Sequence, residues 1–367
     1  MPAAQLFNDC ADCHSMEASI DVRKRWLCRQ CFIKYIGSKP VKRIKSYRLK
    51  EEVIEQPQKL LLPVSGGVSS VVLLQILDGL LQRQFSNRGR KSYELHLLMV
   101  EAPSLVSNRS VAATFDRLKQ KFPSHTFSLV PLPEVFKLDS SICEDLSDLG
   151  AQRGKTPQAS LDTLLSCSKT ASSRTDVLQL LLTRLIVAFA KVNACNGILW
   201  GHSNSRLAAK ALSSVSKGRG GYLPFDVADG PTPWGIAFYY PLRDLFKSEL
   251  AMYTSALPDD FSGLVVHDVA SAPTYTALRA TSIDDLLSAY INNQGEKYPS
   301  LMANVVRTAG KLQMPVSALK QSASTCGICA MPIPETMASQ ESDEPNICYA
   351  CQRLKLETIS SRGPCYQ

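Results

Sequence analysis

The sequence predicts an α/β protein in which a parallel β-sheet core lies between two small metal-binding modules. Three observations predict it. Apolar strand-like segments alternate with helical segments from residue 59 to residue 257, a Ser-Gly-Gly turn joins the first strand to its helix, and four Cys-x-x-Cys pairs are divided between the two ends. With 367 residues and 45% hydrophobic side chains, the chain can bury such a core and still supply both modules.

Two sets of paired Cys-x-x-Cys turns predict the metal modules. Each turn places two thiolates on one side of a knuckle, and two knuckles complete the tetrahedron that zinc prefers in closed structural sites. Reduced thiols are expected in the cytosol, which favours zinc over disulfides. The expected ligands are Cys10, Cys13, Cys28 and Cys31 in the first module, and Cys326, Cys329, Cys348 and Cys351 in the second. Cys143, Cys167, Cys195 and Cys365 show no ligand spacing and are interpreted as free cysteines.

Excess positive charge is confined to the segment from Val22 to Lys50, which contains eleven Lys or Arg and no Asp or Glu. The remaining basic residues of the chain are matched by its 33 acidic ones. Such a segment favours a polyanion such as RNA, and aromatic residues within it can stack on unpaired bases. A solvated charged face is the alternative interpretation. The predicted RNA contacts are Arg23, Lys24, Arg25, Lys42, Arg43 and Lys45, and the aromatic residues are Trp26, Phe32, Tyr35 and Tyr47.

The middle of the chain predicts the order of the core elements. Strands are expected at 59–64, 94–102, 126–132, 197–203 and 236–242, and helices at 69–81, 110–122, 175–195, 206–218, 243–257 and about 281–314. Residues 139–173 are rich in Ser, Asp and Thr and are interpreted as a polar insertion, a candidate mobile flap. The predicted domains are an N-terminal zinc module with its basic segment at 1–50, the α/β core at 51–280, a helical extension at 281–323, and a C-terminal zinc module and tail at 324–367.

The turn PVSGGVSS, residues 63–70, predicts a phosphate site. In parallel sheets, ligands bind at the carboxyl ends of the strands, and the N-terminus of the following helix favours phosphate. Gly66 and Gly67 allow a close approach to the backbone, while Ser65, Ser69 and Ser70 offer hydroxyl groups. Taken alone, a Gly-Gly turn after a strand is more often only a tight turn.

The turn resembles the Ser-Gly-Gly-x-Asp-Ser signature of the PP-loop ATP pyrophosphatases, which include tRNA thiolases. The paired cysteine modules resemble the two-zinc-finger branch of those thiolases. Within that branch, LWGHSNSRLAAKALSSVSKGRGGYLPF and YYPLRDLFKSELAMY are similar to the family of the second subunit of the eukaryotic cytoplasmic tRNA 2-thiolation complex. The resemblance extends from Cys10 to Cys351 and implies an adenine nucleotide alpha hydrolase-like core between two zinc ribbons.

The chain departs from active members of this superfamily at the residues that carry their chemistry. Ser69 stands where they have Asp, and residues 201–206 read Gly-His-Ser-Asn-Ser-Arg where they have Gly-His-Asn-x-Asp-Asp. Cys167 lacks the x-x-Cys partner of active thiolases, so a core sulfur or cluster site is not expected. Mg²⁺ prefers carboxylate and phosphate oxygens, which makes ATP with Mg²⁺ a doubtful cofactor of this subunit. We therefore assign no catalytic residue.

The resemblance implies a non-catalytic subunit that forms a heterodimer with a catalytic paralogue and contributes tRNA-binding surface. Together they would install 2-thiouridine, as mcm5s2U, at the wobble position of cytoplasmic tRNAs for Lys, Glu and Gln, with sulfur from a thiocarboxylated ubiquitin-like carrier. Two alternatives stay open: a self-sufficient ATP-dependent tRNA thiolase, and a zinc-ribbon RNA-binding protein outside modification. The first residues lack the pattern of a secretory signal, and no apolar run reaches the length of a membrane helix. A soluble cytoplasmic protein without a membrane partner is expected.

Overall fold

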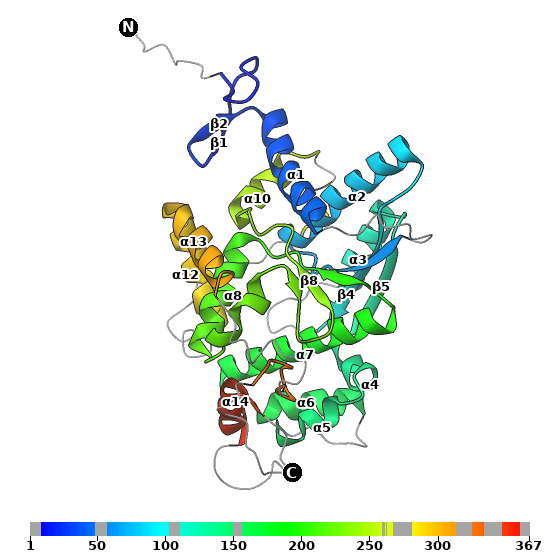
Figure 1. Ribbon diagram of the computed structural model, residues 1–367, viewed down its shortest axis with the longest axis vertical. Coiled ribbons are helices and arrows are strands. Elements are labelled where there is room, and N and C mark those ends of the chain that lie inside the picture. Colours follow the sequence, from blue (N-terminus) through cyan, green and yellow to red (C-terminus); the bar gives the residue numbers. More distant parts are fainter. Residues whose placement is uncertain are drawn as a thin grey trace.

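A computed structural model describes residues 9–47, 57–102, 111–149, 156–258, 261, 263–266, 281–312, 325–333 and 347–359. The N-terminal module lies at one end of the long axis, the sheet lies in the middle, and the C-terminal module lies at the other end (Figure 1). Among the described residues, no helix is both long and apolar enough to cross a membrane. Cys365, residues 150–155 of the predicted insertion and residues 313–323 of the predicted extension lie outside the described residues.

A six-stranded sheet forms the centre of the fold, with the strand order β5-β4-β3-β6-β8-β7. Its strands are β3 (Gln58–Pro63), β4 (Tyr93–Glu101), β5 (Thr126–Pro131), β6 (Gly197–Leu199), β7 (Gly230–Pro231) and β8 (Ala237–Tyr239). All neighbours pair in parallel except the short edge strand β7, which is antiparallel to β8. The predicted α/β class with a mostly parallel sheet is therefore confirmed.

Helices cover both faces of this sheet, which explains why β3 is apolar without interruption. Leu60 and Leu62 are buried in one cluster, whereas Leu61 between them is buried in a second. The first cluster contains residues of α1 (Arg29–Ser46), α2 (Val68–Arg88), α3 (Val111–Lys121) and α10 (Lys247–Ser255). The second contains residues of α7 (Ala171–Val192), α8 (Asn204–Ser216), α9 (Leu223–Val227), α12 (Ile283–Lys297) and α13 (Pro299–Ala309).

The predicted polar insertion is packed rather than flap-like where the structure describes it. It follows β5 through η1 (Leu132–Glu134) and α4 (Val135–Leu138), and contains α5 (Ile142–Asp145), η2 (Ser147–Leu149) and α6 (Pro157–Cys167). Ile142, Leu161 and Leu164 are fully buried in a third apolar cluster. That cluster also contains the C-terminal cysteines and Leu354 of α14 (Tyr349–Ile359). The insertion therefore forms the apolar surface on which the C-terminal module packs.

The N-terminal module is a short hairpin followed by a long helix. Strands β1 (Ile20–Val22) and β2 (Arg25–Leu27) pair antiparallel, and α1 begins directly after Cys28. Phe32, Ile36 and Ile44 of α1 are buried in the first cluster together with α2 and α10. A short 3-10 helix, η3 (Gly220–Tyr222), connects α8 to α9.

Candidate functional site

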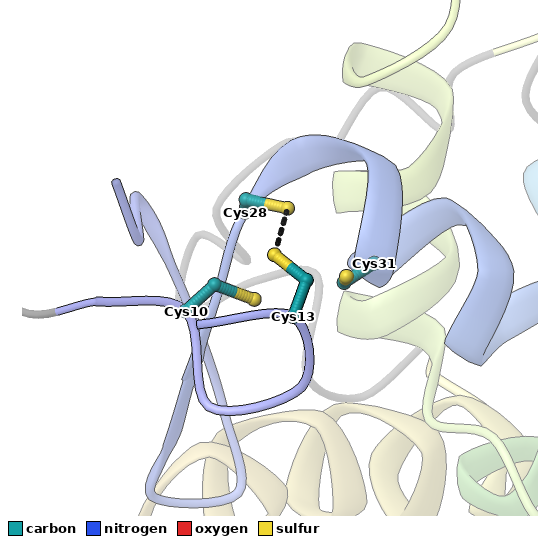
Figure 2. A group of neighbouring side chains, drawn as sticks. All are labelled: Cys10, Cys13, Cys28 and Cys31. Atoms are coloured by element: carbon teal, nitrogen blue, oxygen red, sulfur yellow. Dashed lines mark hydrogen bonds between the residues drawn. The ribbon is translucent and has the colours of Figure 1, made fainter. Parts of the chain in front are cut away.

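The N-terminal cysteines converge on one point, as Figure 2 shows. The four Sγ atoms lie within 4.8 Å of one another, and those of Cys13 and Cys28 are 3.9 Å apart. A tetrahedral site with zinc–sulfur bonds of about 2.3 Å requires sulfur–sulfur separations of about 3.8 Å. Cys10 and Cys13 come from the turn before the hairpin, whereas Cys28 and Cys31 come from the start of α1 (Figure 2). This group can hold a metal ion.

The C-terminal cysteines form a second group of the same kind. Their Sγ atoms also lie within 4.8 Å of one another, with 3.7 Å between those of Cys329 and Cys348. All four residues are buried, and they belong to the third apolar cluster, whereas Cys13 of the first group is exposed. A metal ion held here would be enclosed by the body of the protein, so its loss would expose apolar surface.

Arg184 on α7 ties the C-terminal knuckle to the insertion. Its side chain is only 4% exposed, and it donates to Asp139 and Asp145 at 2.6 Å each. Its Nη1 donates to the carbonyl oxygens of Gly327 at 2.9 Å and Ile328 at 3.2 Å, which belong to the knuckle itself. Burial alone would raise the pKa of Asp139, but the hydrogen bond and charge of Arg184 hold that pKa below its usual range.

Arg219 makes a second buried connection to the same module. Its Nη1 donates to Asp176 on α7 at 2.7 Å, and its Nη2 lies 3.9 Å from the sulfur of Cys351. Burial alone would raise the pKa of Asp176, but the positive charges of Arg219 and Lys217 lower it. The sequence offered one signal for these contacts, namely an arginine inside the otherwise apolar stretch of α7.

The basic segment is used in part to attach the N-terminal module to the core. Arg23 donates to Glu249 of α10 at 2.7 and 2.8 Å. Arg43 donates to Asp229 at 2.8 Å and to Asp244 at 2.9 Å. These two arginines of the predicted RNA-contact set are therefore ion-paired within the chain. Their acidic partners lie about two hundred residues away in sequence, which no local pattern reveals.

Other members of the set are more accessible. Arg25 pairs with Asp12 inside the module. Lys24 in the hairpin turn and Lys42 and Lys45 on α1 are exposed. These three lysines are the part of the predicted RNA contacts that remains at the surface without an ion pair among the described residues.

The four aromatic residues of the segment have different environments. Phe32 is fully buried, and the ring of Tyr47 stacks on Tyr239 with 4.4 Å between ring centroids. The hydroxyl of Tyr47 also donates to Asp229. The expectation that Phe32 stacks on RNA bases was therefore wrong, because its ring is buried, and the half-buried ring of Tyr47 is already stacked on a ring of the core. Trp26 in β2 is 47% exposed, and Tyr35 is half-buried beside Lys39.

The phosphate turn lies between β3 and α2, as predicted, and its hydroxyl groups bond within the turn. Gly67 is the N-cap of α2, and Gly66 adopts the left-handed conformation with φ of 77°. The hydroxyls of Ser65 and Ser70 are 3.3 Å apart, and that of Ser70 donates to the carbonyl of Gly67 at 3.0 Å. Val266 donates its N–H to the carbonyl of Gly66 at 2.9 Å, so a later segment is held against the turn.

The loop after β6 packs against this turn at the carboxyl edge of the sheet. A Cβ atom on Gly201 would lie 2.9 Å from the Cα of Ser70, so only glycine allows this approach. Ser203 caps α8, and the hydroxyl of Ser205 accepts from the N–H of Lys247 at 3.2 Å. Arg206, in the second position where carboxylate is expected, is exposed. The residues that replace the missing carboxylates therefore serve helix ends or project a positive charge.

His202 follows β6, stacks on the ring of Tyr240 and lies at a tilt to that of Trp200. Its ring centroid lies 5.3 Å from that of Trp200 and 5.8 Å from that of Tyr240. Burial, and then the charges of Lys210 and Arg206, hold the pKa of His202 well below its ordinary value. The imidazole is therefore neutral at physiological pH and is suited to packing and hydrogen bonding.

The chain is similar in sequence to one protein family over most of its length. A family model described as Cytoplasmic tRNA 2-thiolation protein 2 matches residues 282–345. The protein of that name from Coccidioides immitis (strain RS) is 38% identical over 369 residues, which cover 95% of this chain and 97% of the relative. Its namesake from Aspergillus oryzae (strain ATCC 42149 / RIB 40) is 40% identical over 370 residues, covering 98% of this chain and 100% of the relative.

A solved structure shares the fold over almost the whole chain. The U34-tRNA thiolase NcsA from Methanococcus maripaludis, determined with its 4Fe–4S cluster, superposes with a TM-score of 0.56 at 14% sequence identity. The superposition covers 97% of each chain. At this identity the likeness concerns the fold, which supports the predicted thiolase-like architecture with its paired terminal modules.

Proposed function

The chain belongs to the cytoplasmic tRNA 2-thiolation protein 2 family, and from this premise we propose that it acts in tRNA 2-thiolation as a non-catalytic subunit beside a catalytic paralogue. The observation that carries this proposal is the state of the phosphate turn. The turn persists, but Ser65 and Ser70 bond within it, and Ser205 and Arg206 take the places of expected carboxylates. Mg²⁺ sites need carboxylate or phosphate oxygens, and the turn and the loop after β6 lack these carboxylates at Ser69, Ser205 and Arg206.

Both groups of four cysteines hold zinc in this proposal. Four thiolates at tetrahedral spacing suit a closed structural zinc site, which keeps no open position for a substrate. The sulfur separations of 3.9 Å and 3.7 Å fit this geometry. The metal then stabilises the knuckles, and it takes no part in the reaction.

The finer assignment rests on the family resemblance. In our proposal, the complex works in the cytoplasm on tRNAs for Lys, Glu and Gln, and its product is the wobble nucleoside mcm5s2U. The paralogue supplies catalysis, and a thiocarboxylated ubiquitin-like carrier supplies sulfur. This chain contributes a tRNA surface from its N-terminal module, supported by the exposed Lys24, Lys42 and Lys45 and the exposed ring of Trp26.

The thiolation activity of the complex should be unchanged by a negative charge in the phosphate turn, because in our proposal the turn has only a structural role. Gly67→Asp is a suitable variant, since Gly67 is a helix N-cap with φ of −72°, and Asp is favoured there. A Cβ atom at this position meets only the hydroxyl of Ser65, at 3.4 Å. Gly67→Asn is the neutral control of the same shape. The measurement is tRNA thiolation with purified paralogue, ATP and a sulfur donor.

Three results of that assay separate the hypotheses. No thiolation by this chain alone, and full activity of the complex with either variant, is the expected pattern. Activity of this chain alone would contradict the non-catalytic assignment. Loss with Gly67→Asp but not with Gly67→Asn would mean that a nucleotide phosphate still binds at the turn.

Changing Lys24, Lys42 and Lys45 simultaneously to Gln should weaken the binding of all tRNAs to a similar extent, whatever their sequence. It should also reduce the dependence of binding on salt concentration. Each lost phosphate contact reduces the slope of log K against log salt by about 1. The control changes Lys191, Lys297 and Lys311, which are exposed elsewhere, to give the same change in net charge. Filter binding of tRNA at several salt concentrations measures both quantities. An unchanged slope in the first variant would identify the lysines as a solvated face.

A further inference from the structure

A cavity of about 160 Å³ lies between α7, α8 and α9, and no residue of the phosphate turn lines it. Trp200, directly after β6, and Phe238 of β8 contribute to its wall, and the C-terminal module contributes Cys329 and Met331. Segments that are distant in sequence therefore enclose one space. Its volume is below the roughly 300–1,000 Å³ of pockets for drug-sized ligands, so it can accommodate about a single ring.

The charged groups around this cavity leave one positive charge without a partner. Asp176 and Asp284 are both paired with Lys217, and Asp176 also accepts from Arg219. Lys210 pairs with Asp226 at 3.0 Å. Arg206 lines the cavity and has no ion pair among the described residues.

Two buried N–H donors in the cavity wall also lack a partner. The indole Nε1 of Trp200 and the Nε of Arg219 have no hydrogen-bond acceptor among the described residues, although both atoms are shielded from solvent. Buried donors are nearly always satisfied in native proteins. Indole and guanidinium groups can only donate, so the missing partner is an acceptor. The neutral His202 adds a third buried nitrogen without a partner among the described residues, its ring Nδ1.

Aromatic side chains shape the space between these donors. Trp200 packs edge-on against Phe238, with 5.4 Å between ring centroids, and Trp234 and Phe225 also line the cavity. Flat apolar walls favour a planar ligand, which gains from stacked or edge-to-face contacts.

We propose that this cavity binds a small planar organic anion, a single ring that carries a carboxylate or an equivalent acceptor group. Arg206 supplies the positive charge, Trp200 and Arg219 donate to the anionic oxygens, and the aromatic walls enclose the ring. Binding of the anion can be measured on this chain alone, without tRNA or the catalytic paralogue. The proposal therefore does not depend on the role of the chain in thiolation.

Tryptophan fluorescence can test the proposal directly, because the chain has three Trp and two of them line the cavity. In a Trp26→Phe background, the signal comes from Trp200 and Trp234 alone. Benzoate is the probe, benzamide is the neutral control of the same shape, and acetate is the anionic control without a ring. Benzoate should change the emission saturably, whereas benzamide should bind at least about tenfold more weakly, as expected for loss of a charge-assisted contact. Acetate should also bind more weakly, because it has no ring to pack against the aromatic walls.

Two variants assign the contacts. Arg206→Gln should weaken benzoate binding by about tenfold or more, and Arg90→Gln, an exposed arginine elsewhere, should leave it unchanged. Trp200→Phe removes the donor and keeps a ring, and calorimetry should show weaker benzoate binding. The absence of saturable benzoate binding, or equal binding of benzamide, would overturn the proposal. Equal binding by Arg206→Gln would also overturn it, and equal binding of acetate would overturn the requirement for a ring.

Discussion

Replacing Arg184 with Met should lower the free energy of unfolding by about 3 kcal/mol, the low end of the range for removing one partner of a buried ion pair. The change leaves the carboxylates of Asp139 and Asp145 without their cation, and the carbonyl oxygens of Gly327 and Ile328 without their donor. Both carboxylates retain some access to water, at 17% and 22% exposure, which is why we expect the low end.

Chemical denaturation of the full chain measures this loss. Arg353→Met is the matched control, because Arg353 pairs with Glu357 at the surface of α14. Exposed pairs contribute less than about 1 kcal/mol, so the control should be nearly neutral. If the two variants were equally stable, Arg184 would not hold the C-terminal module in place.

The same contact should show in the acid stability of the parent protein. The pKa of Asp139 is lowered in the folded state, so its pairing stabilises the fold above the unfolded pKa of about 3.9. That contribution is lost as the pH falls below this value and through the folded pKa. In Arg184→Met the contribution is absent at neutral pH, so the difference in stability between variant and parent should shrink on acidification.

Replacing Cys351 with Ser should unfold the C-terminal module and loosen the insertion that supports it. Structural zinc sites contribute about 10–16 kcal/mol of apparent binding free energy in small modules, comparable to the whole stability of a domain at about 5–15 kcal/mol. Cys351 is fully buried in the cluster that also contains Ile142, Leu161 and Leu164. Loss of the metal therefore exposes apolar side chains of the insertion as well as the knuckle.

The comparison variant is Cys13→Ser, which removes the one exposed cysteine of the N-terminal group. Bound zinc should fall from two ions to one in either variant, because there are two groups of four cysteines. In limited proteolysis, the protease should cleave within residues 132–185 in the Cys351→Ser variant but not in the Cys13→Ser variant. Equal protection of this region in both variants would contradict the structural role of the second metal site.

The sequence was sufficient for features that depend on local pattern. The apolar run at 59–64 predicted the strand β3, and the cysteine spacing predicted two groups of ligands, because both signals lie within a few residues. The use of Arg23 and Arg43 could not be predicted, since their partners Glu249 and Asp244 are far along the chain. Charge excess alone does not reveal whether a basic residue faces RNA or an acidic side chain of the same protein.

The insertion was misjudged for a related reason. Its many Ser, Asp and Thr residues indicated exposure, but its few apolar residues, such as Ile142 and Leu161, meet the C-terminal module. Average composition hides such a pattern when the complementary surface lies about two hundred residues away. The cavity beside Arg206 escaped prediction in the same way, because five separate segments form its wall.

The third apolar cluster also constrains the order in which the chain can fold as it is synthesised. It joins apolar residues between 132 and 185 to residues between 326 and 354, so this cluster is complete only after the second part has left the ribosome. Chains are synthesised at roughly 5–20 residues per second, so the insertion emerges on the order of ten seconds before the C-terminal module that completes its cluster. Burial of these side chains is completed only when the knuckles of Cys326, Cys329, Cys348 and Cys351 pack against them.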